Sequence, residues 1–166
     1  MGQPQKHFGK YRAVVVNVND PLRLGRIQAI VPELSHGQPS NWAMPCVPFA
    51  GPHMGLYFLP PVGAHVWMEY EAGDLARPIW AGGFWQTADE LPAAPTAMAV
   101  VLQTAQKNVI TITDQPGSDG GIVLRSTSGA SIAVGDAGIF ISNGKGATIT
   151  LVGPSVSVNN GALEIV

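Results

Sequence analysis

Hydrophobic residues in the last third of the chain recur with a two-residue period. Seven short segments, separated by Gly, Asn, Asp, Ser or Pro, each carry two apolar side chains at positions i and i+2. Such a pair lies on one face of a β-strand, and the residue between them lies on the other face. The pattern therefore predicts a series of short strands that repeat as supersecondary units over residues 109–166. The pairs are Ile110/Ile112, Ile122/Leu124, Ile132/Val134, Ile139/Ile141, Ile149/Leu151, Val156/Val158 and Leu163/Ile165.

One copy of this segment is too small to bury its own apolar pairs. As a single-chain solenoid it forms at most about three coils, which is close to the minimum for a stable repeat structure. If three chains wind around one axis, each strand pairs with strands of its two partners and the apolar pairs meet at a dry centre. Burying each Ile, Val or Leu contributes roughly 1.5–3 kcal/mol. We therefore expect a homotrimer whose core is formed by all seven pairs, with a single-chain solenoid as the alternative.

The N-terminal half also has the pattern of β-strands, and no helical period of useful length is present. Strands are expected over residues 10–18, 23–33, 42–50 and 77–85, with two more in 55–74. Gly25 interrupts the second of these, as is common at a bulge or a sharp bend. Short strands in about 80 residues with such a bend are typical of a small closed barrel of the OB type. The Ala- and Pro-rich stretch that follows reads as a connector.

Three motifs, in this order, carry a family resemblance. They are V…ND…GR(I/V)…VP over Val14–Pro32, W…P…P over Trp42–Pro48, and G…F.P..G..V…E…GD…P…G over Gly55–Gly82. Together they resemble the OB domain of phage baseplate assembly protein V and of the valine-glycine-repeat spike proteins. In that family the OB domain precedes a trimeric, intertwined β-helix. The resemblance implies an all-β protein with an OB collar at residues 1–85, a connector at 86–108 and a β-helix needle at 109–166.

The resemblance also implies a function and partners. The chain is expected to be the central spike of a contractile injection machine, such as a phage tail, a tailocin or an extracellular contractile injection system. Seated on a baseplate hub protein through its OB end, it would pierce the target envelope when a sheath contracts. Contacts to the hub are expected from the loops around Asn19–Arg26, Pro52–Gly55 and Leu59–Gly63. The alternative is an OB-type binding module with a solenoid tail that acts as an adhesin or carbohydrate-binding fibre.

The last five residues of the sequence carry a second expected contact. An exposed strand end is a surface for association. The last strand of this sequence carries the apolar pair Leu163/Ile165. We expect a separate tip protein of the PAAR-repeat type to bind there. The residues concerned are Ala162, Leu163, Glu164, Ile165 and Val166.

Composition excludes several classes of function. Only 12% of residues are charged and the net charge is −2, which argues against binding the phosphate backbone of nucleic acid. The four His residues are scattered without the spacing of metal ligands, and the His-x-His pair that ends some spikes of this family is absent. No Gly-x-Ser-x-Gly motif and no cleft for paired carboxylates are apparent. We expect no enzyme activity, no metal and no cofactor.

Two further expectations concern the environment of the chain. The start of the sequence lacks the apolar region of a secretory signal, so we expect synthesis in the cytoplasm and assembly into a tail-like particle. Cys46 is the single cysteine and lies between Pro45 and Val47, where it is expected to be a small buried residue. Only Phe140 is aromatic after Trp85, which counts against a carbohydrate-binding fibre.

Overall fold

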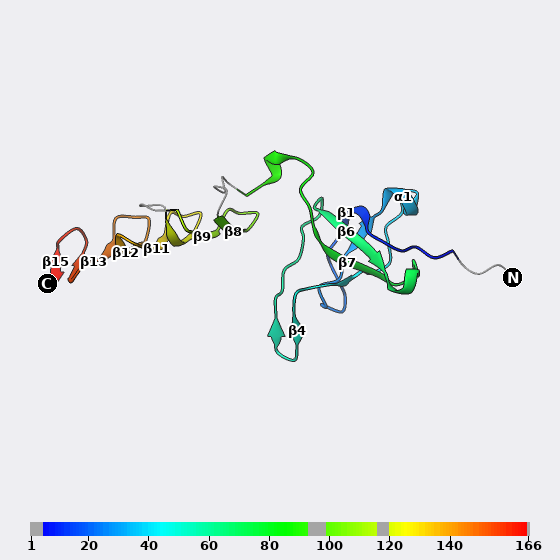
Figure 1. Cartoon of the computed structure of the whole chain (residues 1–166), viewed down its shortest axis with the longest axis horizontal. Coiled ribbons are helices and arrows are strands. Elements are labelled where there is room, and N and C mark those ends of the chain that lie inside the picture. The colour runs from blue at the N-terminus through cyan, green and yellow to red at the C-terminus, as the bar shows by residue number, and fades with distance from the viewer. Residues whose placement is uncertain (1–4, 93–98, 116–119, 166) are drawn as a thin grey trace. The chain divides into compact units, whose positions relative to one another are not determined.

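The structure is a computed structural model that describes residues 5–92, 99–115 and 120–165. Strands dominate it, and its helical segments are one four-residue α-helix and two short 3-10 turns (Figure 1). The chain divides into two compact units, residues 1–90 and 91–166. Each unit has its own sheet, and each is described by itself below.

The N-terminal unit is a closed β-barrel. Its sheet has the order β2-β1-β6-β7-β3, with β3 parallel to β7 and the other pairs antiparallel. A bridge between Ile27, beside β2, and Ala43, beside β3, joins the two edges through backbone N–H···O bonds of 3.2 and 2.8 Å. The sheet therefore closes on itself, as expected for an OB barrel. The strands are β1 (Tyr11–Asn17), β2 (Gln28–Ile30), β3 (Met44–Pro45), β6 (His65–Tyr70) and β7 (Pro78–Gly83).

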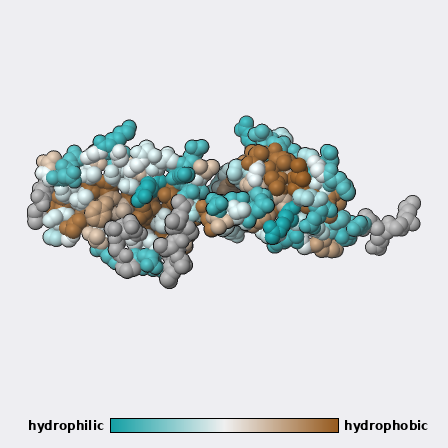
Figure 2. All heavy atoms as spheres, turned by 90° about the horizontal axis from the view of Figure 1, so that it is seen from above, coloured by the Kyte–Doolittle hydropathy of each residue, from teal (hydrophilic) through white to brown (hydrophobic). Residues whose placement is uncertain are grey.

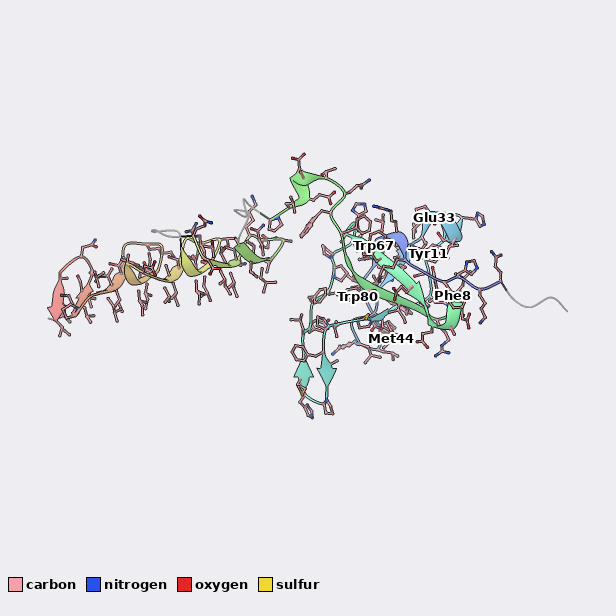
Figure 3. All side chains as sticks on the ribbon, viewed as in Figure 1. Phe8, Tyr11, Glu33, Met44, Trp67 and Trp80 are labelled. Atoms are coloured by element: carbon pink, nitrogen blue, oxygen red, sulfur yellow. The ribbon has the colours of Figure 1, made fainter. Side chains whose placement is uncertain are left out.

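Alternating residues of these strands fill the barrel. Trp80 is fully buried, and its Nε1 donates a hydrogen bond of 3.2 Å to the backbone oxygen of Gly25 (Figure 3). Without this partner, burial of the tryptophan would leave its indole N–H without a hydrogen bond. The barrel thus completes its own core. The buried cluster is Ala13, Val15, Ile27, Ala29, Val31, Ala43, Val66, Met68 and Trp80.

The barrel differs from expectation in its loops. The second strand is only three residues long, and residues 23–26 belong to a loop instead. Within 55–74 only β6 and the end of a small hairpin are strands, because Pro60 and Pro61 lack the N–H groups that a ladder needs. The remaining elements are β4 (Ala50–Gly51), β5 (Met54–Gly55), α1 (Pro32–Ser35), and the 3-10 turns η1 (Glu71–Gly73) and η2 (Ala88–Glu90).

The C-terminal unit is one antiparallel sheet in which the strands follow in sequence order. It has eight strands among the described residues, one more than expected, because β8 lies in the stretch 86–108 that we expected to be a connector. The backbone pairing also differs from expectation, since consecutive strands pair within the chain through short turns. The strands are β8 (Ala99–Gln103), β9 (Val109–Thr113), β10 (Gly121–Arg125), β11 (Ser131–Gly135), β12 (Gly138–Ser142), β13 (Thr148–Val152), β14 (Ser155–Val158) and β15 (Leu163–Ile165).

Glycine is required at two strand starts in this sheet. Gly138 has φ +135°, and a Cβ added there would lie 2.1 Å from the backbone oxygen of Leu151. Gly121 has φ +88°, and its added Cβ would lie 2.1 Å from the backbone oxygen of Val134. Both distances are far below a van der Waals contact, so only glycine lets the neighbouring backbones approach this closely.

Candidate functional site

The register of the C-terminal sheet aligns the apolar pairs of all its strands into two columns. Ile122, for example, lies opposite Ile112 on one side and Val134 on the other. Because side chains alternate along a strand, both columns lie on the same face of the sheet. The first column is Leu102, Ile110, Leu124, Ile132, Ile141, Ile149, Val158 and Leu163. The second is Val100, Ile112, Ile122, Val134, Ile139, Leu151, Val156 and Ile165.

The two apolar columns bring together all fourteen residues expected to form a trimer core. They also include Val100 and Leu102 of β8, which sequence reasoning missed although the two have the same i, i+2 spacing. Figure 3 shows a row of side chains projecting from one side of this sheet. Side chains that lie opposite each other on neighbouring strands are about 5 Å apart. The register therefore joins the separate apolar pairs into one continuous apolar surface.

This surface is open in the single chain. Twelve of the sixteen column residues are exposed, with 41% of Ile132 and 69% of Val100 accessible to solvent. The other four, on β12, β13 and β14, are half-buried. A hollow of about 570 Å³ lies over the first column and is lined by Leu102, Ile110 and Leu124 among others. Figure 2 shows hydrophobic residues at the surface of this unit. Soluble proteins rarely expose so extended an apolar face unless another molecule covers it.

The opposite face of the sheet is different in character. Its central positions run Val101, Thr111, Val123, Ala133, Phe140, Thr150 and Ser157 across seven neighbouring strands. All but Phe140 are half-buried in the single chain, and Phe140 is exposed. The face becomes polar toward the C-terminal strands, where Thr150 and Ser157 follow Phe140. The opposite face is therefore mixed in character, whereas the face with the two columns is uniformly apolar.

The expected tip segment lies on the last strand of the sheet. β15 pairs with β14 and with no other described strand, so its second edge is open. Leu163 and Ile165 are exposed and end the two apolar columns. The backbone N–H of Ala162 donates to the oxygen of Asn159, which closes the turn before β15. Val166 lies outside the described residues.

An ion pair shapes the loop of residues 20–26 in the barrel. The Asp20 carboxylate accepts N–H bonds from the backbone of Leu22, Leu24 and Arg26, at 3.0, 2.8 and 3.3 Å. It also accepts hydrogen bonds from Nε and Nη2 of Arg26, at 3.0 and 2.6 Å. The guanidinium of Arg26 lies 5.6 Å from the ring centre of Trp42. The Arg26 bonds hold the pKa of Asp20 well below its usual range, against the opposing effect of burial. The loop is therefore fixed in shape around one carboxylate.

Two family models match the chain, one for each unit. Residues 11–85 match the model described as the Type VI secretion system/phage-baseplate injector OB domain. Residues 99–164 match the model described as the phage baseplate V C-terminal trimerisation domain. The chain belongs to the phage baseplate assembly protein V family. A comparison with curated proteins found no match.

Membership of the baseplate V family confirms the expected fold class. The chain is an all-β protein in which an OB domain precedes a homotrimeric domain, and its role is in a baseplate spike. The trimerisation match starts at Ala99, the first residue of β8. This domain therefore includes β8, which lies in the stretch that we expected to be a connector.

Candidate metal ligands are dispersed over the described residues. No group of three or more His, Cys, Asp or Glu side chains in the described ranges lies close enough to hold a metal ion. His65 lies with its Nδ1 3.9 Å from a carboxylate oxygen of Glu90, and His7 packs near Tyr11 and Tyr70. The matched families are structural components of baseplates and injectors. In the parts of the chain that the structure describes, no helix is long and apolar enough to cross a membrane.

The expectation for Cys46 is wrong. Its side chain is exposed, although its backbone N–H is bonded to the oxygen of Trp80 at 2.9 Å. The apolar neighbours that suggested burial, Pro45 and Val47, line a surface hollow and not the barrel core. An apolar stretch in the sequence can thus mark a surface as well as an interior.

Proposed function

We propose that this baseplate V protein is the central spike of a contractile injection machine and pierces the target envelope when a sheath contracts. The observation that carries the proposal is the pair of apolar columns, which one chain leaves open. Three copies around a common axis would bury both columns against each other. The fourteen residues named from the sequence, with Val100 and Leu102, are the proposed trimer core.

The proposed mechanism is mechanical. Successive strands are joined by backbone hydrogen bonds in sequence order, so an axial load passes from strand to strand through these bonds. Side chains buried between copies would resist sliding, since close-packed interiors have low compressibility. The small side chains on the opposite face, such as Ala133, Thr150 and Ser157, keep the outer surface narrow. No catalytic step is required.

Two partners complete the proposal. A hub protein of the baseplate would hold the OB barrel, and a tip protein of the PAAR-repeat type would cover Ala162–Val166. The open edge of β15 and the exposure of Leu163 and Ile165 support the second contact. Deleting residues 162–166 should remove tip binding and leave the trimer intact. Retained tip binding would contradict this assignment.

Light scattering on the purified chain tests the core of the proposal. The wild-type protein should have three times the 17.4 kDa mass of one chain. The double variant Ile132→Asp, Ile141→Asp places charges in the first column and should be monomeric, with the barrel still folded. The matched control Ala133→Asp, Thr150→Asp changes the opposite face and should remain trimeric. A monomeric wild-type protein would remove the basis for the spike.

The role in a particle requires a second measurement. Contractile particles purified from the producing cell should contain the chain in three copies each, as determined by quantitative mass spectrometry. Particles whose chain carries the Ile132→Asp, Ile141→Asp pair should fail to permeabilise target cells. Particles that contain no copy of the chain, or that permeabilise targets equally well with the variant, would contradict the proposed role.

A further inference from the structure

A second exposed apolar surface lies on the barrel, separate from the trimerisation sheet. The loop of residues 20–26 and the β4–β5 hairpin with the segment after it surround a hollow of about 380 Å³. We call this the loop patch, and define it by Leu24, Met54, Leu56, Tyr57 and Phe58, which line the hollow. All five are exposed, Tyr57 to 73%. Together with Leu22 of the loop and Phe49, which directly precedes the hairpin, these residues expose on the order of 800 Å². This is about what each partner contributes to a stable interface.

We propose that the loop patch is the surface by which the barrel docks on a baseplate protein, and that this partner presents an apolar surface with an acidic or neutral rim. The inference rests on the proposed function, because only a baseplate component needs a docking partner of this kind. It assigns to particular residues a contact that the sequence could only place in loops.

The loop patch is built to keep its shape. Five hydrogen bonds to the Asp20 carboxylate fix the loop that carries Leu24. The buried Trp80 binds the backbone oxygen of Gly25, and the ring of Tyr57 lies so close to Gly25 that an added Cβ would be 3.2 Å from it. A surface that is already ordered loses little conformational entropy on binding. These bonds therefore fix the backbone of the loop that carries Leu24 before any partner arrives.

Two of the four non-glycine residues with positive φ in the described part of the barrel lie at the same place. Arg23, with φ 55°, and His53, with φ 59°, are non-glycine residues in the left-handed region. Each lies in one of the two segments that form the loop patch, and both are exposed. Such conformations cost free energy and persist where the surroundings impose them, often at binding surfaces. Arg23 also places a positive charge in the loop that carries Leu24, whereas Asp20, the carboxylate of that loop, is buried in its ion pair.

A neighbouring copy of the chain fits the loop patch poorly. In a ring with threefold symmetry, one face of each copy contacts a different face of the next copy. A contact between copies at the loop patch would therefore need a second apolar surface on the barrel to cover it. The other large apolar side chains exposed on the described part of the barrel come from five different segments. They are Phe8, Met44, Val62, Leu75 and Trp85, and no two of them line any of the barrel hollows of about 550, 380, 340 and 180 Å³. Trimerisation also has its own domain, at residues 99–164.

A pair of matched variants tests the assignment. Leu24→Glu places a carboxylate in the loop patch, and Leu75→Glu makes the same change at another half-exposed leucine of the barrel. Both should remain trimeric by light scattering and should melt within a few degrees of the wild type. In purified particles the Leu24→Glu chain should fall at least tenfold in abundance, and the Leu75→Glu chain should stay at the wild-type level. Equal abundance of both variants would overturn the assignment.

A crosslinking experiment identifies what covers the patch. Benzoylphenylalanine in place of Tyr57, within assembled particles, should link the chain to a different baseplate protein, and the same amino acid in place of Phe8 should not. Crosslinked products with masses that are multiples of 17.4 kDa would mean that a second copy covers the patch and would overturn the proposal. Particles without the wild-type chain would instead contradict the proposed function, which keeps the two failures distinct.

Discussion

The barrel and the C-terminal sheet differ in how their apolar side chains are buried. In the barrel, an edge-to-edge bridge at Ile27 and Ala43 closes the sheet, and the core residues Val15, Met68 and Trp80 are fully buried within one chain. In the C-terminal sheet the strands follow one after another without closure, and the apolar columns remain open. The barrel should therefore fold as a single chain, whereas the sheet should depend on association. Each prediction below tests this difference, from the largest expected effect to the smallest.

Ile132→Ala should have the largest effect, because the change is repeated in every copy of the trimer. Ile132 lies in the first apolar column and is 41% exposed in the single chain. Buried isoleucines lose about 2–5 kcal/mol on truncation to alanine, so three copies lose this amount three times. Analytical ultracentrifugation over a concentration series should show dissociation at a higher protein concentration than for wild type. Unchanged dissociation would mean that Ile132 stays exposed in the trimer.

Trp80→Ala should destabilise the barrel without affecting association. The side chain is fully buried and bonded to Gly25, and large-to-small changes of this kind cost about 3–5 kcal/mol. Denaturant unfolding followed by tryptophan fluorescence should show an earlier barrel transition, while light scattering still reports a trimer. Trp80→Phe serves as the control, because it keeps most of the volume and loses the hydrogen bond. Loss of the trimer in Trp80→Ala would show that the two units are coupled.

Gly138→Ala should destabilise the sheet through its backbone. The added Cβ meets the oxygen of Leu151, so the strand start must move, at a cost of about 1–3 kcal/mol. Gly146→Ala is the matched control, since Gly146 also has a positive φ, +102°, but no atom within 4 Å of an added Cβ. The melting temperature of the trimer should fall more for Gly138→Ala than for Gly146→Ala. Equal shifts would assign the whole effect to the φ angle.

Asp20→Asn should have the smallest effect, and one that depends on pH. The folded state lowers the pKa of Asp20, so its contribution to stability is present above the ordinary carboxyl pKa of about 4 and is lost as the pH falls below it. The melting temperature of the barrel should therefore be lower in the variant than in the wild type at pH 7, and the difference should shrink toward pH 2. Asp89→Asn, at an exposed position, should show no such trend. A difference that is constant with pH would exclude the ion pair as its cause.

The sequence predicts the face of each strand better than it predicts the path of the chain. The i, i+2 spacing of pairs such as Ile149/Leu151 is a local property, and the structure places all seven pairs on one face. Val100/Leu102 have the same spacing, but their Ala- and Pro-rich surroundings suggested a connector. Strand pairing within the chain was also missed, because periodicity gives the face of a side chain and not the partner of its strand.

The loops of the barrel were the least predictable part. Residues 23–26 were expected to begin the second strand, yet the Asp20 carboxylate accepts the backbone N–H groups of Leu24 and Arg26 that a strand could use for its ladder. Asp20 was expected only as part of a loop that contacts the hub, since nothing local indicates that Arg26 folds back onto it. Leu56, Tyr57 and Phe58 of the loop patch were likewise counted as strand residues, because tertiary contacts decide which apolar residues reach the surface.

The sequence-ordered pairing of the C-terminal sheet has a consequence for how the spike lengthens. Every strand from β9 to β14 is bonded to the strand before it and the strand after it, and each of the eight strands contributes one residue to each column. Inserting or deleting a hairpin of two strands would therefore preserve the phase of both columns and the direction of the chain. The length of the C-terminal sheet can thus change during evolution in steps of one hairpin, with no change to the barrel or to the surface by which it docks.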